Sequence, residues 1–119
     1  MTQRTLTISQ SADWRTGLRK AARAARSGGY AGEVLNFESP AQLFGQLSDK
    51  RWELVRLAQG KGPLTVRELA RLAQRDVKRV HEDVVALAGL GLFERTASGG
   101  VLCPFNSIHV DFLLEASAA

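Results

Sequence analysis

The stretch Leu64–Leu92, LTVRELARLAQRDVKRVHEDVVALAGLGL, decides the fold, because it carries the pattern of two helices joined by a tight turn. Thr65 and Glu68 have the spacing of a capping box, in which each side chain bonds the backbone N–H of the other residue. This box predicts that a first helix begins after Thr65 and continues to about Ala73. Its expected buried stripe consists of Val66, Leu69, Ala70 and Leu72.

A second helix is predicted over residues 76–90, after the turn Gln74-Arg75. Asp76 is a favoured N-cap residue, and its negative charge lies where the helix dipole stabilises it. Gly91 follows the last apolar position, as is typical of a helix end. The helix has one apolar face, which we expect to be buried, at Val77, Val80, Val84 and Leu87. Together the two helices predict a helix-turn-helix.

The opposite face of the second helix is basic at its start. Arg75, Lys78 and Arg79 form a cationic cluster there, and such side chains bond guanine edges and DNA phosphates. Arg67, in the first helix, is a further predicted DNA contact. Glu82 has two interpretations: it accepts a hydrogen bond from a cytosine amino group, or it pairs with a cation one helical turn away.

A hairpin is predicted directly after the helix pair, over residues 93–103. Apolar and polar residues alternate on both sides of the turn segment 96–100, TASGG, and Pro104 ends the return strand. Arg95 lies near the tip of this hairpin. It is interpreted either as a phosphate or minor-groove contact, or as an exposed charge that keeps a strand edge from pairing.

Residues 62–95, GPLTVRELARLAQRDVKRVHEDVVALAGLGLFER, and 101–112, VLCPFNSIHVDF, resemble the winged helix-turn-helix DNA-binding proteins near the MarR-type regulators of bacteria and archaea. The segment RDVKRVHEDV and the ending P-F-x-x-I-x-V-x-F are the close matches. The resemblance implies a winged helix-turn-helix that binds double-stranded DNA and regulates transcription as a repressor. It carries a DNA-facing role over to Arg75, Lys78, Arg79 and Arg95.

The same resemblance implies a second function, since some members of such families are antitoxins that repress their own operon. A toxin protein would then be a further partner. A third hypothesis is a winged helix that binds proteins and has lost DNA binding.

The first part of the chain, residues 1–38, is predicted to form a separate β-α-β unit. Residues 4–9 and 33–37 alternate like strands, with a helix expected from Ser11 to about Arg26. Such a unit cannot bury both faces alone, so we expect it to build a homodimer; the rival interpretation is that its strands pair only within the chain. The predicted fold class is therefore α+β, with residues 39–119 as the DNA-binding domain.

The helix expected near residues 12–26 carries a stripe of arginines. A functional interpretation is a phosphate contact or a docking surface for an acidic partner, and the alternative is a solvated face. The arginines are Arg15, Arg19, Arg23 and Arg26.

Composition limits the function classes. The 119 residues include 16 Lys and Arg against 12 Asp and Glu, a net charge of +4 that permits nucleic-acid binding without requiring it. A single cysteine, Cys103, excludes an intramolecular disulfide and is expected to be a buried apolar residue. No apolar run is long enough to span a bilayer, so we expect a cytoplasmic protein without a membrane partner.

Catalytic chemistry has no support in the sequence. The two histidines, His81 and His109, lie in different predicted elements, and neither has a cysteine or carboxylate at metal-ligand spacing. His81 lies beside the apolar stripe of the second helix and is expected to be partly buried. We therefore expect no enzyme activity, no metal and no cofactor.

Overall fold

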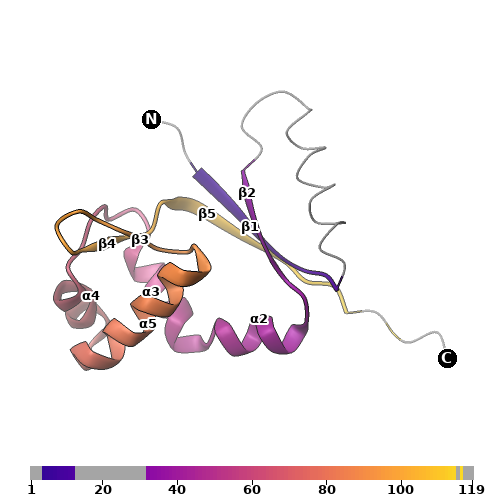
Figure 1. Ribbon diagram of the computed structural model, residues 1–119, viewed down its shortest axis with the longest axis horizontal. Helices are drawn as coiled ribbons and strands as arrows, with labels where there is room; N and C mark the ends of the chain where they lie inside the picture. Colours follow the sequence, from indigo (N-terminus) through magenta and orange to yellow (C-terminus); the bar gives the residue numbers. More distant parts are fainter. Residues whose placement is uncertain (1–3, 13–31, 115, 117–119) are drawn as a thin grey trace.

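The stretch that begins at Leu64 folds into two helices in the computed structural model, α4 (Val66–Ala73) and α5 (Val77–Leu90) (Figure 1). Both hydrogen bonds of the predicted capping box are present. The Glu68 backbone N–H donates to Thr65 Oγ1 at 3.0 Å, and the Thr65 N–H donates to Glu68 Oε1 at 3.2 Å. Asp76 is the N-cap of α5, as predicted. The structure describes residues 4–12, 32–114 and 116.

The ends of the two helices also follow the sequence. Gln74, the C-cap of α4, adopts a left-handed conformation with φ 55°, which reverses the chain within the turn. Gly91 ends α5 with φ 92°, a conformation that glycine adopts without steric cost. Two shorter helices precede the pair, α2 (Pro40–Gln46) and α3 (Asp49–Ala58). Ser39 and Ser48 are their N-caps.

The helices α3, α4 and α5 share one apolar core. The expected stripe of α5 is buried at Val80, Val84 and Leu87. The expectation is wrong for Val77 and for Leu72 of α4, which are 42% and 43% exposed. Both residues flank the turn between α4 and α5. In the described residues, no helix is both long and apolar enough to cross a membrane.

A three-stranded parallel sheet lies beside the helices. Its central strand is β1 (Arg4–Gln10), which pairs with β2 (Glu33–Phe37) on one side and with β5 (Phe105–Asp111) on the other. The strands expected over 4–9 and 33–37 are confirmed, and both pair within the chain. The third strand, β5, was not predicted. The helix expected near residues 12–26, with its four arginines, lies outside the described residues.

The sheet and the helices share a continuous core. Leu6 and Ile8 of β1 and Phe37 of β2 belong to the same buried cluster as the apolar residues of α3, α4 and α5. The predicted boundary between units 1–38 and 39–119 falls between β2 and α2. However, β5 comes from the second unit and completes the sheet of the first. The division into two units therefore stays a prediction.

The predicted hairpin is present but short, with antiparallel strands β3 (Glu94–Arg95) and β4 (Val101–Leu102). Val101 and Leu64 exchange backbone hydrogen bonds of 2.7 and 2.8 Å, which tie the hairpin to the start of the helix pair. A Cβ at Gly100 would lie 2.7 Å from the Leu64 carbonyl oxygen, so this close approach requires glycine. The described part of the chain is thus a mixed α+β fold.

Two leucines of α4 test how this core is packed. Leu69 is fully buried and Leu72 is 43% exposed. We expect Leu69→Ala to lower the free energy of unfolding by about 2–5 kcal/mol, because it removes buried methyl groups and leaves a cavity. Leu72→Ala is the matched control on the same helix and should cost less than about 1 kcal/mol. Urea unfolding followed by circular dichroism measures both, and equal losses would contradict the packing described here.

Candidate nucleic-acid interface

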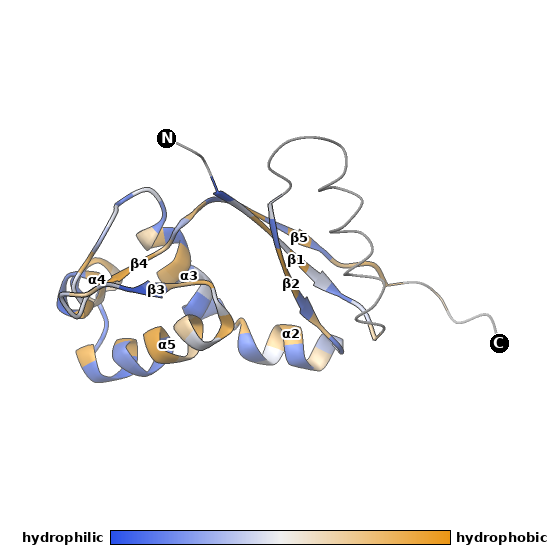
Figure 2. Cartoon of the chain, turned by 45° about the horizontal axis from the view of Figure 1, so that its top comes forward, coloured by the Kyte–Doolittle hydropathy of each residue, from blue (hydrophilic) through white to orange (hydrophobic). Residues whose placement is uncertain are grey.

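The start of α5 presents cations to solvent. Lys78 and Arg79 are exposed, and neither forms an ion pair with another described residue. Hydrophilic residues prevail in the first turns of α5 in Figure 2. These two side chains are therefore free to bind an anionic partner.

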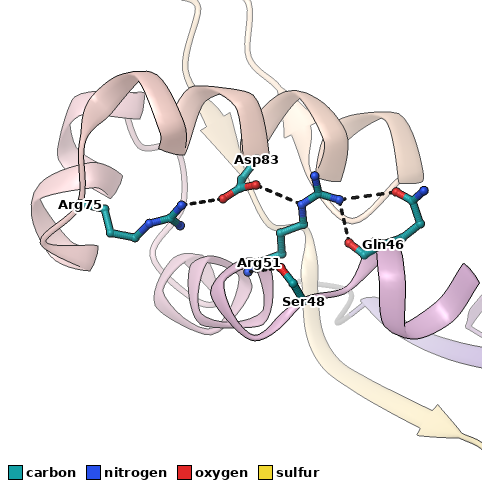
Figure 3. Close-up of polar contacts among 5 residues, drawn as sticks. All are labelled: Gln46, Ser48, Arg51, Arg75 and Asp83. Carbon is teal, nitrogen blue, oxygen red and sulfur yellow. Dashed lines mark hydrogen bonds and ion pairs between the residues drawn. The ribbon is translucent and has the colours of Figure 1, made fainter. Parts of the chain in front are cut away.

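An ion-pair network lies directly behind this surface (Figure 3). Asp83, one turn farther along α5, accepts a hydrogen bond from Arg75 Nη2 at 2.8 Å and another from Arg51 Nε at 3.1 Å. Arg51 Nη1 donates to the backbone carbonyl of Gln46 at 2.8 Å. The network connects the end of α2, the first turn of α3, the turn before α5 and α5 itself.

The carboxyl of Asp83 is held in its charged form. Burial is the largest single influence and raises its pKa, but the hydrogen bonds and positive charges of Arg75 and Arg51 together outweigh it. The pKa of Asp83 therefore lies below its usual range. Two guanidinium groups face one carboxylate, so the network retains a net positive charge.

Arg75 is less exposed than the other two members of the predicted cluster, Lys78 and Arg79. Its side chain is only 19% exposed, and its Nη2 atom is bonded to Asp83. Its Nη1 atom is buried and has no hydrogen-bond partner among the described residues. The ion pair with Asp83 thus holds the turn against α5.

A cleft of about 490 Å³ opens between the start of α3 and the start of α5. Lys50, Lys78 and Arg79 bring positive charge to it, and Asp76 is engaged in capping α5. In the described residues, Glu82 is the one acid lining the cleft that neither forms an ion pair nor caps a helix. The lining residues are Ser48, Lys50, Arg75, Asp76, Lys78, Arg79, Glu82 and Asp83.

The other predicted site residues are dispersed. Arg67 of α4 and Arg95 of β3 are exposed, but neither lines the cleft. Glu82 is exposed, and the expected ion pair with Lys78 or Arg79 is absent from the described ion pairs. Its interpretation as a hydrogen-bond acceptor for DNA stays a prediction.

Two further expectations have clear outcomes. His81 was expected to be partly buried, and this is wrong: it is exposed, because its side chain lies off the stripe formed by Val80, Val84 and Leu87. Cys103 is buried, as predicted, and burial raises the pKa of its thiol. In the part of the chain that the structure describes, no group of three His, Cys, Asp or Glu residues could hold a metal ion.

Sequence reasoning missed the partners Arg51 and Gln46 and the inward position of Asp83. One signal was available, because Asp83 lies three residues after Val80 and four before Leu87. These spacings place it beside the apolar stripe. A carboxylate at such a position requires a buried partner. The partner itself comes from α3, 32 residues away, and no local pattern identifies it.

The fold and the cleft define a small α+β protein whose cleft carries cations and acids from the start of α3, the turn before α5 and α5 itself. The chain belongs to the HVO_A0114 family, whose model matches residues 46–110. The matched range begins at Gln46, which bonds Arg51, and contains all the residues that line the cleft. Searches of curated proteins and of solved structures gave no match.

The Asp83 network makes a pH-dependent contribution to stability. We expect Asp83→Asn to lower the free energy of unfolding by about 1–3 kcal/mol at neutral pH, because it leaves two guanidinium groups without their charged acceptor. The pKa of Asp83 is lowered in the folded state, so the contribution is complete above the unfolded-state pKa of about 3.9. The contribution to stability is lost as the pH falls through the lower pKa that Asp83 has in the folded state.

The measurement is urea unfolding of both proteins between neutral and strongly acidic pH. Glu82→Gln is the matched control, because it removes an exposed, unpaired carboxylate from the neighbouring position of α5. A wild-type advantage over Asp83→Asn that stays constant throughout the acidic range would contradict the assignment.

Proposed function

We propose that this protein is a sequence-specific DNA-binding regulator of transcription that inserts α5 into the major groove. The observation that carries the proposal is the pair of exposed cations Lys78 and Arg79, which form no ion pair with another described residue. They lie on a helix held by the partly buried Asp83 network. A DNA duplex presents phosphates on both sides of the major groove. A helix that offers cations along its exposed start is therefore matched to it.

The arrangement of the neighbouring elements supports a winged helix-turn-helix. Three helices, α3, α4 and α5, are followed directly by the β3–β4 hairpin. In such a fold the third helix reads base edges and the hairpin contacts the backbone or the minor groove. Arg95, exposed on β3, would supply this contact of the hairpin with the backbone or the minor groove.

The cleft between α3 and α5 supports a specific phosphate contact. Lys50 approaches it from the first turn of α3 and Lys78 from α5. We infer that one backbone phosphate at the edge of the major groove occupies this cleft. Arg75 and Asp83 then act as positioning residues at the wall of the cleft, because their ion pair holds the turn against α5.

Base readout would come from exposed side chains of α5 that line the same cleft. Arg79 can bond guanine through two parallel hydrogen bonds, and Glu82 can accept one from a cytosine amino group. The protein would act as a repressor by occupying its operator. The operator itself can be identified by selecting bound duplexes from a random library.

The proposal predicts salt-dependent DNA binding that depends on α5. We expect Lys78→Ala to weaken binding to the selected duplex roughly tenfold and to reduce the slope of log affinity against log salt by about 0.9, since one phosphate contact is lost. Fluorescence anisotropy titrations at several salt concentrations measure both quantities.

Lys61→Ala is the control variant, because this exposed lysine lies beyond the C-terminal end of α3, away from Ser48 and Lys50. It should leave the affinity and the slope nearly unchanged. If the wild-type protein has no salt-dependent affinity for duplex DNA, the proposal fails and a protein-interaction function is favoured. If Lys61→Ala and Lys78→Ala have equal effects, the assignment of the surface to α5 is wrong.

A further inference from the structure

The strand β5 forms one edge of the parallel sheet. Among the described residues the strand order is β2-β1-β5, so β5 has one hydrogen-bonded neighbour and an open outer edge. Five of its seven residues are exposed. A strand of this length with an open edge is a template for pairing with another strand.

The side of the sheet that carries the core continues onto this edge. The register with β1 places Ile108 beside Leu6 and Val110 beside Ile8, so the four side chains share one face. Ile8 is fully buried in the central strand, whereas Val110 is 43% exposed. An apolar surface therefore reaches this edge, and the described residues leave it partly exposed there.

The apolar surface extends beyond the end of β5. The ring of Phe112 packs edge-on against that of Phe44 in α2, with 5.3 Å between the ring centroids. Phe44 is nevertheless 59% exposed. Leu113 and Leu114, which follow directly, are more exposed still. Exposed apolar side chains of this size near an open sheet edge are typical of a protein–protein contact.

We propose that a second copy of this chain covers this edge, by antiparallel pairing of the two β5 strands about a two-fold axis at Val110. In this register Val110 faces Val110 of the partner subunit, and Ile108 faces the partner's Phe112. On the other face of the sheet, His109 lies opposite the partner's Asp111. Apolar side chains thus meet on one face and a hydrogen-bonding His–Asp pair forms on the other.

Charge complementarity selects this register over its neighbours. An axis at Asp111 would place two like charges directly opposite each other, which is destabilising. An axis at His109 would place Asp111 opposite Ser107 and lose the His–Asp pair. The axis at Val110 is thus the one of these three that pairs the acid of one strand with the imidazole of the other.

The opposite edge of the sheet is less suited to self-pairing. An antiparallel pairing of β2 about its central residue, Leu35, would place Glu33 opposite Phe37 and Val34 opposite Asn36. Each pair joins a polar and an apolar side chain. Glu33 also forms an ion pair with Arg4 at 2.7 Å. The dimer expected from the N-terminal strands is therefore assigned to the C-terminal strand of the same sheet.

This interface uses no residue of α5 or of the cleft, so it goes beyond the proposed function and does not depend on it. A dimer that also binds DNA would bring two copies of α5 to the same duplex. Failure of DNA binding would leave the interface untouched. Failure of the dimer would likewise leave binding by a single chain.

Cysteine cross-linking tests the interface, with one variant for each edge of the sheet. Val110→Cys and Val34→Cys replace valines of equal exposure, 43% each, on β5 and β2. Both are made in a Cys103→Ala background, and circular dichroism checks the fold of each. Opposed residues of an antiparallel pair lie within the Cα separation that a disulfide spans.

We expect oxidation of the Val110→Cys protein to give a species of twice the 12.9 kDa chain mass on a non-reducing gel. The Val34→Cys protein should run at the mass of a single chain on the same gel, because its cysteines lie on the opposite edge of the sheet. Absence of a cross-link at Val110→Cys, or equal cross-linking of the two variants, would overturn the proposal.

A charge swap tests the register independently. Asp111→Lys removes the two His–Asp pairs of the dimer, and we expect the dissociation constant from equilibrium sedimentation to rise roughly fivefold. Adding His109→Glu to the same chain restores opposite charges and should restore the affinity. A wild-type protein that sediments as a monomer at every concentration would contradict the proposal. A double variant whose dimer dissociation constant is as high as that of Asp111→Lys would contradict it as well.

Discussion

The carboxylate of Asp83 is the interaction on which the arrangement of the helices depends. It is 17% exposed and accepts hydrogen bonds from arginines of two different segments, one in α3 and one in the turn before α5. Desolvation makes an isolated carboxylate at such a position costly, so the site is stable only when both guanidinium groups are in place. The ion pairs therefore specify the orientation of α5 more strictly than apolar packing alone, which tolerates rotation of a helix about its axis.

Local signals in the sequence predicted the helices well. The caps at Thr65, Asp76, Ser39 and Ser48 bond backbone groups within three residues, so each is readable from a short stretch of chain. The third strand of the sheet could not be predicted in this way. Its partner, β1, lies about a hundred residues earlier in the chain. A parallel pairing over such a separation has no local signature. The shared core of sheet and helices follows from that pairing.

The candidate site was predicted in part, for a related reason. Helical spacing correctly placed Lys78 and Arg79 on the exposed face of α5, because it depends on geometry within one helix. The same reasoning grouped Arg75 with them, although Arg75 precedes the helix and turns inward toward Asp83. A helical projection gives the direction of a side chain around the axis. It does not identify a partner on another element. Here that partner decides whether a cation is exposed or held in an ion pair.

The distribution of charge around α5 bears on the proposal that this surface binds DNA. Lys50, Lys78 and Arg79 face one cleft, and their mutual repulsion opposes folding. An acid in the second turn of α5 could have neutralised them, yet Asp83 is directed inward to two other cations and Glu82 pairs with none among the described residues. A fold selected for stability alone would gain from an ion pair at this surface. Its absence is consistent with a partner that brings the missing negative charge, and a phosphate backbone brings it at regular intervals along its length.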